Sequence, residues 1–132
     1  MPSDFTVAIS IEDEAVFICD KDKIPEEHSC FDIGPKTIEI YKSYLNEVKT
    51  VVWNGTMGVA ENRFFQAGTF QLAKALTEID GMVVIAGGDT VAAIMELGFK
   101  DNYSHVSTGG GATIEMLEGR ELPGIKVIAE CE

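Results

Sequence analysis

Three glycine-rich stretches, and the acidic residues beside them, are where this 132-residue chain could do chemistry. They read WNGTMGVAE at 53–61, AGGDT at 86–90 and STGGGA at 107–112. Glycine allows a backbone to approach a ligand closely, and a helix that begins after such a turn offers unpaired N–H groups to an anion. The last two stretches are therefore candidate sites for a polyphosphate, although each could also be a plain tight turn before a helix.

Asp89 is the most informative of these residues, because a bare carboxylate would repel a phosphate. A Mg²⁺ ion between the two would remove that repulsion, since Mg²⁺ binds carboxylate and phosphate oxygens together. Asp89 could equally be a helix N-cap, which accepts N–H bonds from the next turn. Thr90 could donate its hydroxyl to a phosphate or merely occupy the first turn. Glu61 could bind ribose hydroxyls or be a solvated surface charge.

The elements that would position these turns alternate along the second half of the chain. Strands are predicted at 50–54, 82–86 and 104–107, and helices at 68–79, 89–97 and 111–118. This alternation predicts βαβ units and a parallel sheet. Ligands bind beyond the carboxyl ends of the strands in open α/β sheets, so the three glycine turns are expected to line one crevice.

The first half is predicted to begin with a β-hairpin over residues 5–24, followed by a loop that runs from Pro25 through CFDIGP. A helix should then open at Gly34-Pro35. The apolar stripes expected to face inward are Ile38, Tyr41, Leu45 and Val48 in this helix, and Phe70, Ala73, Leu76 and Ile79 in the next. The last helix is expected to stop before Leu122-Pro123.

The predicted fold class is α/β, a partial Rossmann-like three-layer sandwich with a parallel sheet core and an N-terminal β-hairpin. Three parallel strands make a small sheet with an uncovered edge. The chain is therefore expected to be part of a larger α/β domain.

Composition excludes several classes of function. The net charge of −12 argues against nucleic-acid binding and against an anionic membrane surface, both of which favour a basic protein. No apolar run reaches the roughly 18 residues of a membrane span, and no signal peptide is recognised, so a cytoplasmic location is expected. Cys19, Cys30 and Cys131 are far apart and odd in number, so they are expected to be reduced hydrophobic residues.

Other catalytic signatures are missing from the sequence. It contains neither G-x-x-x-x-G-K-[ST] nor G-x-G-x-x-G, and no lysine or arginine lies beside AGGDT or STGGGA. His28 and His105 have no triad partners at suitable places, and His105 is expected to be a structural strand residue. Trp53 is expected to pack in the core rather than stack on a base.

The glycine stretches together resemble the phosphoglycerate kinase family, specifically its C-terminal, nucleotide-binding domain. The family pattern W-N-G-P-M-G-x-F-E is similar to WNGTMGVAE, and G-G-G-D-[ST] is similar to AGGDT. The longest match is STGGGATIEMLEGRELPG, which follows S-T-G-G-G-A-[ST]-x-E-x-L-x-G-x-x-L-P-G. PSD and FDIGPKTIEIY also look like family sequence, so the resemblance covers essentially the whole chain.

The resemblance implies reversible phosphoryl transfer between 1,3-bisphosphoglycerate and ADP in glycolysis, giving 3-phosphoglycerate and Mg-ATP. The residues that would bind Mg-ATP or Mg-ADP by motif match are Asn54, Gly55, Val59, Glu61, Gly87, Gly88, Asp89 and Thr90. Asp89 would hold the Mg²⁺ ion and Glu61 the ribose hydroxyls. Gly109, Gly110 and Gly111 would offer N–H groups to the phosphoryl group in flight, which suits a transfer that depends on positioning and charge stabilisation.

The chain departs from the family pattern at three positions. Thr56 replaces a proline and Ala60 replaces a phenylalanine, and both changes are expected to loosen packing beside the nucleotide. Ala86 replaces the first glycine of G-G-G-D, a small change that alanine accommodates if its φ is negative.

Family members are much longer than this chain. Their N-terminal domain, whose basic patch binds the acid substrate, and a glycine-alanine-lysine motif have no counterpart here. Residues 1–132 are therefore expected to be the C-terminal part of the nucleotide-binding domain, inactive alone, from a monomeric parent that binds 3-phosphoglycerate through the absent domain. The alternative is a non-catalytic nucleotide-binding or oligomerising module from a truncated kinase, which pairs with other chains through its uncovered sheet edge.

Overall fold

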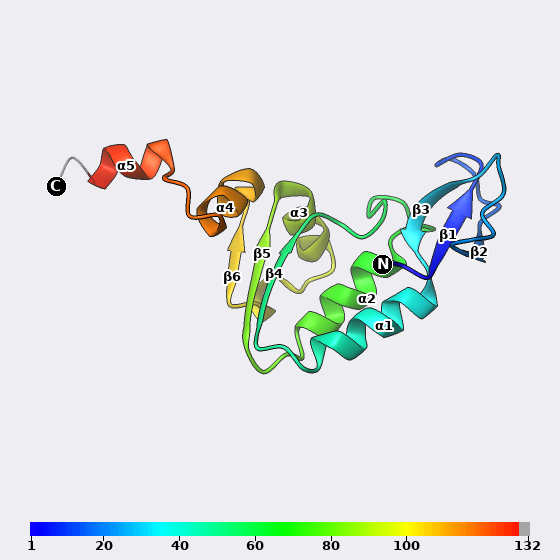
Figure 1. Cartoon of the computed structure of the whole chain (residues 1–132), viewed down its shortest axis with the longest axis horizontal. Coiled ribbons are helices and arrows are strands. Elements are labelled where there is room, and N and C mark those ends of the chain that lie inside the picture. Colours follow the sequence, from blue (N-terminus) through cyan, green and yellow to red (C-terminus); the bar gives the residue numbers. More distant parts are fainter. Residues whose placement is uncertain (130–132) are drawn as a thin grey trace.

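The computed structural model describes residues 1–129, whose strands form two separate sheets (Figure 1). In chain order the elements are β1 (Asp4–Ala8), β2 (Phe17–Asp20), β3 (Ser29–Ile33), α1 (Pro35–Leu45), β4 (Thr50–Asn54), α2 (Ala67–Leu76), β5 (Met82–Ala86), α3 (Gly88–Glu96), a short 3₁₀ helix (Lys100–Asn102), β6 (His105–Ser107), α4 (Gly110–Leu117) and α5 (Pro123–Ala129). The strand orders are β2-β1-β3 and β4-β5-β6. The predicted α/β fold class is confirmed.

The first sheet is antiparallel and contains the predicted N-terminal hairpin. β1 pairs with β2 from Asp4 opposite Asp20 to Val7 opposite Phe17. The prediction of a loop through CFDIGP is wrong, because β3 pairs with the other edge of β1. Asp32 lies within β3, and aspartate is depleted in strands, so the local sequence hides a strand that its distant partner stabilises.

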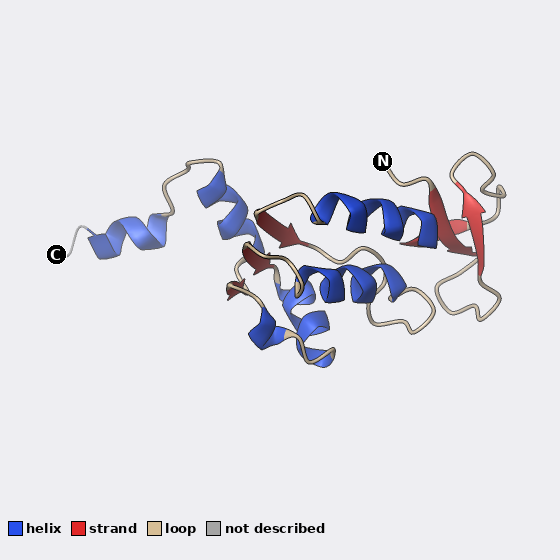
Figure 2. Cartoon of the chain, turned by 90° about the horizontal axis from the view of Figure 1, so that it is seen from below, coloured by secondary structure: helices blue, strands red, loops and turns tan. Residues whose placement is uncertain are grey.

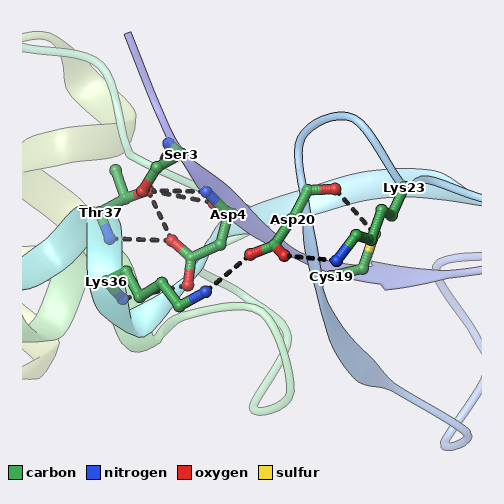
Figure 3. A network of polar contacts seen from close by, with 7 residues as sticks. All are labelled: Ser3, Asp4, Cys19, Asp20, Lys23, Lys36 and Thr37. Carbon is green, nitrogen blue, oxygen red and sulfur yellow. Dashed lines mark hydrogen bonds and ion pairs between the residues drawn. The ribbon is translucent and has the colours of Figure 1, made fainter.

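Helix α1 begins at Pro35, as predicted, because proline is tolerated in the first helical turn. Its N-cap residue, Gly34, has no side chain to cap the helix, and the Asp4 carboxylate of β1 does so instead (Figure 3). This carboxylate accepts the N–H groups of Lys36 at 3.0 Å and Thr37 at 2.8 Å. Asp4 therefore fixes the first sheet to the helix that leads to the second.

The second sheet is parallel, as the alternation of strands and helices predicts. β4 and β5 pair in register along their whole length. Ala86, at the end of β5, lies opposite both Asn54 of β4 and Ser107 of β6. The carboxyl ends of all three strands therefore meet at one edge, where each is followed by a glycine-rich turn.

One face of the parallel sheet carries the main core. Its buried members are Trp53, Ala73, Leu76, Val83, Ile85, Val91 and Ile94, which come from β4, β5, α2 and α3. Trp53 is 5% exposed and belongs to the core, as predicted. Burial of these side chains holds both helices against the same face, which fixes where α3 begins relative to the end of β5.

Two predicted helix faces need correction. Val48 lies beyond the end of α1 at Leu45 and is exposed. The prediction that Phe70 faces inward is wrong, because Phe70 is exposed and lies 6.1 Å, between ring centroids, from Phe99. The buried positions of α2 are Gly68, Thr69, Leu72, Ala73 and Leu76. Ala73 and Leu76 are therefore buried as predicted, whereas Gly68, Thr69 and Leu72 complete the buried face in the place of Phe70. Ile79 packs partly buried against the core, beyond the end of α2 at Leu76.

The opposite face of the parallel sheet is open. Val52 and Met82 lie on it and are 41% and 55% exposed, and His105 of β6 is also exposed there. β4 is in addition an edge strand of this sheet. Parallel sheets are normally covered on both faces, whereas the described residues leave one face of this sheet open and both of its edge strands, β4 and β6, paired on one side only.

The C-terminal end contains a helix that was not predicted. Gly119 follows α4 with a φ of +78°, as expected at a helix C-terminus. The chain then forms α5 from Pro123, which is compatible with a first helical turn. This helix extends away from both sheets (Figures 1 and 2), and its Ile125, Val127 and Ile128 are exposed.

Within residues 1–129, every helix is too short or too polar to cross a membrane. Cys19 is buried in β2 and Cys30 is exposed in β3. Cys131 lies outside the described residues.

Candidate functional site

The three glycine turns meet at the carboxyl end of the parallel sheet. Asn54 ends β4, and its Oδ1 atom lies between the two later turns. A Cβ atom added to Gly87 would be 2.5 Å from this oxygen, and one added to Gly110 would be 2.9 Å from it. The same position on Gly110 is 2.9 Å from the Gly87 Cα atom. The structure therefore brings the turns together, as expected from the sequence, and leaves no room for a side chain at either glycine.

Gly87 is constrained for a second reason. Its φ is +94°, a region that residues with a Cβ atom avoid. In this conformation its N–H group donates to the Ser107 carbonyl at 3.1 Å. The turn after β5 is thereby fixed to the end of β6.

The start of α3 is a helix N-terminus suited to an anion. Gly87 is the N-cap, and the first hydrogen bond at this end runs from the Val91 N–H group to the Gly87 carbonyl at 2.9 Å. The N–H groups of the first turn have no acceptor within their own helix. Asp89 lies inside this turn, is exposed, and is not the N-cap residue.

Thr90 joins the first turn of α3 to the turn after β4. It has no exposed surface, and its hydroxyl accepts the Gly55 N–H group at 2.8 Å across 35 positions of sequence. The hydroxyl of Thr90 therefore faces the protein. The contact with a phosphate that the sequence suggests for this residue remains a prediction.

The STGGGA turn uses two of its N–H groups internally. That of Gly109 donates to the Ser107 hydroxyl at 3.2 Å, and that of Gly110 donates to the Thr108 carbonyl at 3.1 Å. Gly111 follows in the first turn of α4, where an added Cβ would meet nothing within 4 Å. Of the three N–H groups expected to face a phosphoryl group, that of Gly111 is the one best placed at an open helix start.

The turn after β4 is fixed by bonds to two other elements. The Met57 N–H group donates to the Thr69 hydroxyl of α2 at 3.0 Å. The Val59 N–H group donates to the Phe31 carbonyl of β3 at 3.0 Å. These bonds give the turn a defined path from Asn54 toward the residues expected to face the nucleoside.

The departures from the family pattern lie in the same turn. Thr56, in the place of proline, donates its hydroxyl to the Gly58 carbonyl at 2.8 Å and so closes the turn with a hydrogen bond. Ala60 lines a hollow of about 250 Å³ shared with α2 and α3, which a phenylalanine at this position would partly fill. Glu61 is exposed directly after it.

Asp32 belongs to the site but was not predicted from the sequence. Its carboxylate is 3% exposed and accepts the N–H groups of Ile33 and Gly68, both at 2.8 Å. A Cβ atom on Gly58 would be 2.5 Å from its Oδ1 atom. Burial raises the pKa of this carboxyl, against the opposing effect of the N–H groups of Gly68, Ile33 and Ala67. Because Gly68 is 36 positions away, no local pattern indicates this contact.

A metal ion at the glycine turns would rest on Asp89 as its protein carboxylate. Within residues 1–129 there is no group of three or more His, Cys, Asp or Glu side chains that could hold a metal ion. A single carboxylate suits Mg²⁺ that is bound mainly by phosphate oxygens and water. The donor set therefore fits an ion that arrives with a nucleotide.

A larger hollow, of about 580 Å³, lies away from the glycine turns. It is lined by the second halves of α1 and α2 and by residues that precede β4 and β5. Four of its charged side chains form two ion pairs, since Lys49 contacts Asp80 at 2.7 Å and Lys42 contacts Glu39 at 3.1 Å. Size alone therefore does not identify the site, and the glycine turns remain the better candidate.

An open parallel sheet with glycine turns and a helix N-terminus at its carboxyl end defines an α/β protein with a candidate anion site. The family model described as "Phosphoglycerate kinase" matches residues 1–120. The chain belongs to the phosphoglycerate kinase family.

Individual relatives agree with this assignment. "Phosphoglycerate kinase" of Clostridium botulinum (strain 657 / Type Ba4) is 47% identical over 129 residues, which are 97% of this chain and 32% of the relative. "Phosphoglycerate kinase" of Macrococcus caseolyticus (strain JCSC5402) is 52% identical over 120 residues, 90% of this chain and 30% of the relative. The solved phosphoglycerate kinase from Coxiella burnetii superposes with a TM-score of 0.89 at 39% identity, over 96% of this chain and 33% of that one. The chain thus spans about a third of the length of these relatives.

Proposed function

We propose that this chain carries part of the Mg-ADP and Mg-ATP site of a phosphoglycerate kinase. The observation that supports this most directly is the position of the Asn54 Oδ1 atom between Gly87 and Gly110. It brings two helix starts and one long turn together at the carboxyl end of a parallel sheet, where nucleotides bind in open α/β folds.

Different residues of the site would contact different parts of the nucleotide. The backbone of Gly87 and Gly88 and the first turn of α3 would bind phosphate oxygens, and Asn54 would contact the phosphate chain from its place between the turns. Gly55 and Val59 would border the adenosine, and Glu61 would accept hydrogen bonds from the ribose hydroxyls. The STGGGA turn would face the transferring phosphoryl group, with the Gly111 N–H group nearest to an open helix start.

Asp89 would hold the Mg²⁺ ion that accompanies the nucleotide. The bound ion would neutralise phosphate charge during transfer. Asp89 is exposed in the first turn of α3, so its carboxylate is available to an ion without breaking a capping bond. Without the ion, the same carboxylate would repel the phosphates.

The proposed site lacks the positive charge that phosphoryl transfer needs. Stretches 86–90 and 107–112 contain no lysine or arginine, and residues 1–132 match about a third of the length of the relatives. The transfer between 1,3-bisphosphoglycerate and ADP is therefore a property we assign to the longer parent protein. A coupled kinase assay on the purified 132-residue chain should show no turnover, and a normal kinase rate would refute this part.

Titration calorimetry with Mg-ADP tests the site directly. Asp89→Ala should weaken Mg-ADP binding about tenfold, because it removes a charged ligand of the ion. Asp101→Ala, an exposed aspartate in the first turn of the 3₁₀ helix, should leave binding unchanged.

The same titration with ADP and a chelator supplies a second control. Asp89→Ala should then bind at least as well as the wild type, because repulsion by the carboxylate has been removed. Equal Mg-ADP binding by wild type and Asp89→Ala would contradict the role of Asp89. No binding by the wild type would contradict the nucleotide site in this chain.

A second candidate function is assembly with other chains, and the open sheet face supports it. Val52 and Met82 on this face are exposed, and β4 offers an unpaired edge. Analytical ultracentrifugation would detect a stable oligomer, and Val52→Lys should dissociate it if this face is the interface. Thr77→Lys serves as the control for added charge, because Thr77 is the C-cap of α2 and its hydroxyl forms a surface hydrogen bond to the Lys74 carbonyl. A monomer at all concentrations would reject this candidate.

A further inference from the structure

We infer that Asp32 is a positioning residue that holds the turn of residues 55–61 in place for nucleotide binding. The effect of this positioning on nucleotide binding rests on the proposed function. The contacts that define it lie within the chain and can be tested without a ligand.

Asp32 lies near the end of β3 and caps a helix on another part of the chain. The N-cap of α2, Gln66, makes no side-chain capping bond. The Asp32 Oδ2 atom accepts the Gly68 N–H group at 2.8 Å and supplies the missing cap. A carboxylate at a helix start is favoured by the helix dipole, so this contact fixes α2 to the end of β3.

The same carboxylate also touches the glycine turn. Gly58 packs so closely on it that an added Cβ would be 2.5 Å from the Asp32 Oδ1 atom and 2.5 Å from the Phe65 carbonyl oxygen. The next residue, Val59, donates its N–H group to the carbonyl of Phe31. Two successive residues of β3 therefore hold two successive residues of the turn.

These contacts place Asp32 at the junction of three elements. It connects β3, the start of α2 and the middle of the turn, while Thr69 of α2 accepts the Met57 N–H group from the same turn. If the Asp32 contacts are lost, the start of α2 is released from β3, so Thr69 and Phe31, which both accept N–H groups of the turn, are no longer fixed relative to each other. Val59 and Glu61, which would face the nucleoside, lie just beyond this point and would lose their defined position.

The chain contains a matched control for this role. Asp4 is also a buried carboxylate on a strand of the first sheet, and it caps the start of α1 through the N–H groups of Lys36 and Thr37 (Figure 3). It touches no residue of the 55–61 turn among its described hydrogen bonds. Asp4→Asn and Asp32→Asn therefore remove the same kind of cap, and only the second acts on the turn.

Amide hydrogen exchange distinguishes positioning from general stability. In Asp32→Asn, one side-chain oxygen is replaced by an NH₂ group that cannot accept the second N–H bond. Exchange at Met57, Val59 and Gly68 should rise about tenfold relative to the amides of β5, which report the core. In Asp4→Asn these three amides should change only in step with β5, while Lys36 and Thr37 exchange faster.

Each outcome of the exchange experiment either supports or overturns the positioning role of Asp32. A selective rise in the turn with Asp32→Asn, not shared by Asp4→Asn, supports positioning. A rise that merely follows β5, or an equal rise in both variants, overturns it. Should Asp32→Asn fail to fold, Gly58→Ala takes its place, since its methyl group would collide with the intact carboxylate. Unchanged exchange at Met57 and Val59 in that variant overturns the inference as well.

Mg-ADP calorimetry then connects the turn to binding. Asp32→Asn should weaken binding about tenfold while Asp4→Asn binds as the wild type does. If the wild type binds no Mg-ADP, the proposed function fails, but the exchange pattern still decides whether Asp32 positions the turn. If the wild type binds and Asp32→Asn binds equally well, the positioning role fails alone.

Discussion

Gly110→Ala should separate the turns that form the candidate site and destabilise the chain measurably. The new Cβ atom would lie 2.9 Å from the Gly87 Cα atom, whereas carbon atoms pack at about 3.5–4.0 Å. At least about 0.6 Å of displacement is needed, and Gly87 cannot rotate aside easily because its φ is +94°. Overpacking of this kind costs about 1–3 kcal/mol, less about 0.4–1 kcal/mol gained by restricting the unfolded chain.

Gly111→Ala is the adjacent control. An added Cβ there meets nothing within 4 Å, and Gly111 lies in the same helix start. This variant should be stabilised by about 0.4–1 kcal/mol, because the unfolded chain loses freedom and the folded chain gains no clash. The two alanine variants differ by one position in sequence and should differ in the sign of their effect on stability.

Urea unfolding followed by circular dichroism measures the difference. With a slope of about 1–3 kcal/mol per molar urea, the two midpoints should lie roughly 1 M apart, with Gly110→Ala below the wild type and Gly111→Ala above it. Coincident midpoints for the two variants would refute the close approach of Gly87 and Gly110. They would also remove the main geometric support for the site.

The remaining predictions concern ionisable groups. Burial alone would raise the pKa of Asp4, but hydrogen bonds from the side chain and backbone of Thr37 and from the backbone of Lys36 outweigh it and hold the pKa below its usual range. The stability that Asp4 contributes is therefore fully present above the unfolded-state carboxyl pKa of about 3.9 and is lost as the pH falls through the lower folded-state pKa. The thermal midpoint of Asp4→Asn should therefore vary less than that of the wild type between about pH 5 and about pH 2.5. Burial raises the pKa of Asp32, so its contribution to stability should fall as the pH rises through its folded-state pKa. The difference in thermal midpoint between wild type and variant should therefore change with pH in opposite directions for Asp4→Asn and Asp32→Asn. A change in the same direction for both variants would contradict these two predictions. Burial also raises the pKa of Tyr103 to about 12, and its hydroxyl donates to the Ala73 carbonyl at 2.9 Å. Tyr103→Phe should lower the free energy of unfolding by about 1 kcal/mol at neutral pH. The difference should shrink above about pH 10, because the tyrosine of the unfolded wild type then ionises while that of the folded protein does not. Urea unfolding at neutral pH and at about pH 11 measures this.

The strands and helices of the second half could be predicted because their signals are local. β4 and β5 have the predicted bounds, since each is a continuous apolar run between polar or glycine-rich residues. β3 could not be predicted, because its pairing with β1 depends on residues more than 20 positions away. The sequence does not predict α5, because Leu122-Pro123 indicates the end of a helix, whereas in the structure Pro123 begins one.

The candidate site divides in the same way. Glycine turns at strand ends are visible in the sequence, and the structure brings them together around Asn54. The contacts that hold them are long-range: Thr90 bonds Gly55 and Asp32 bonds Gly68, each across about 35 residues. An aspartate in a strand gives no local sign that it caps a helix elsewhere, so the contacts of these supporting residues could be identified only in the structure.

Trp53 gives the candidate site an optical reporter of its own. It is the single tryptophan of the chain, it is 5% exposed, and it immediately precedes Asn54 at the end of β4. Its indole Nε1 has no hydrogen-bond partner among residues 1–129, so its emission should be shifted toward shorter wavelengths than that of a solvated tryptophan. Any event that moves the end of β4 can therefore be followed by intrinsic fluorescence, without a label and without a second tryptophan to confuse the signal.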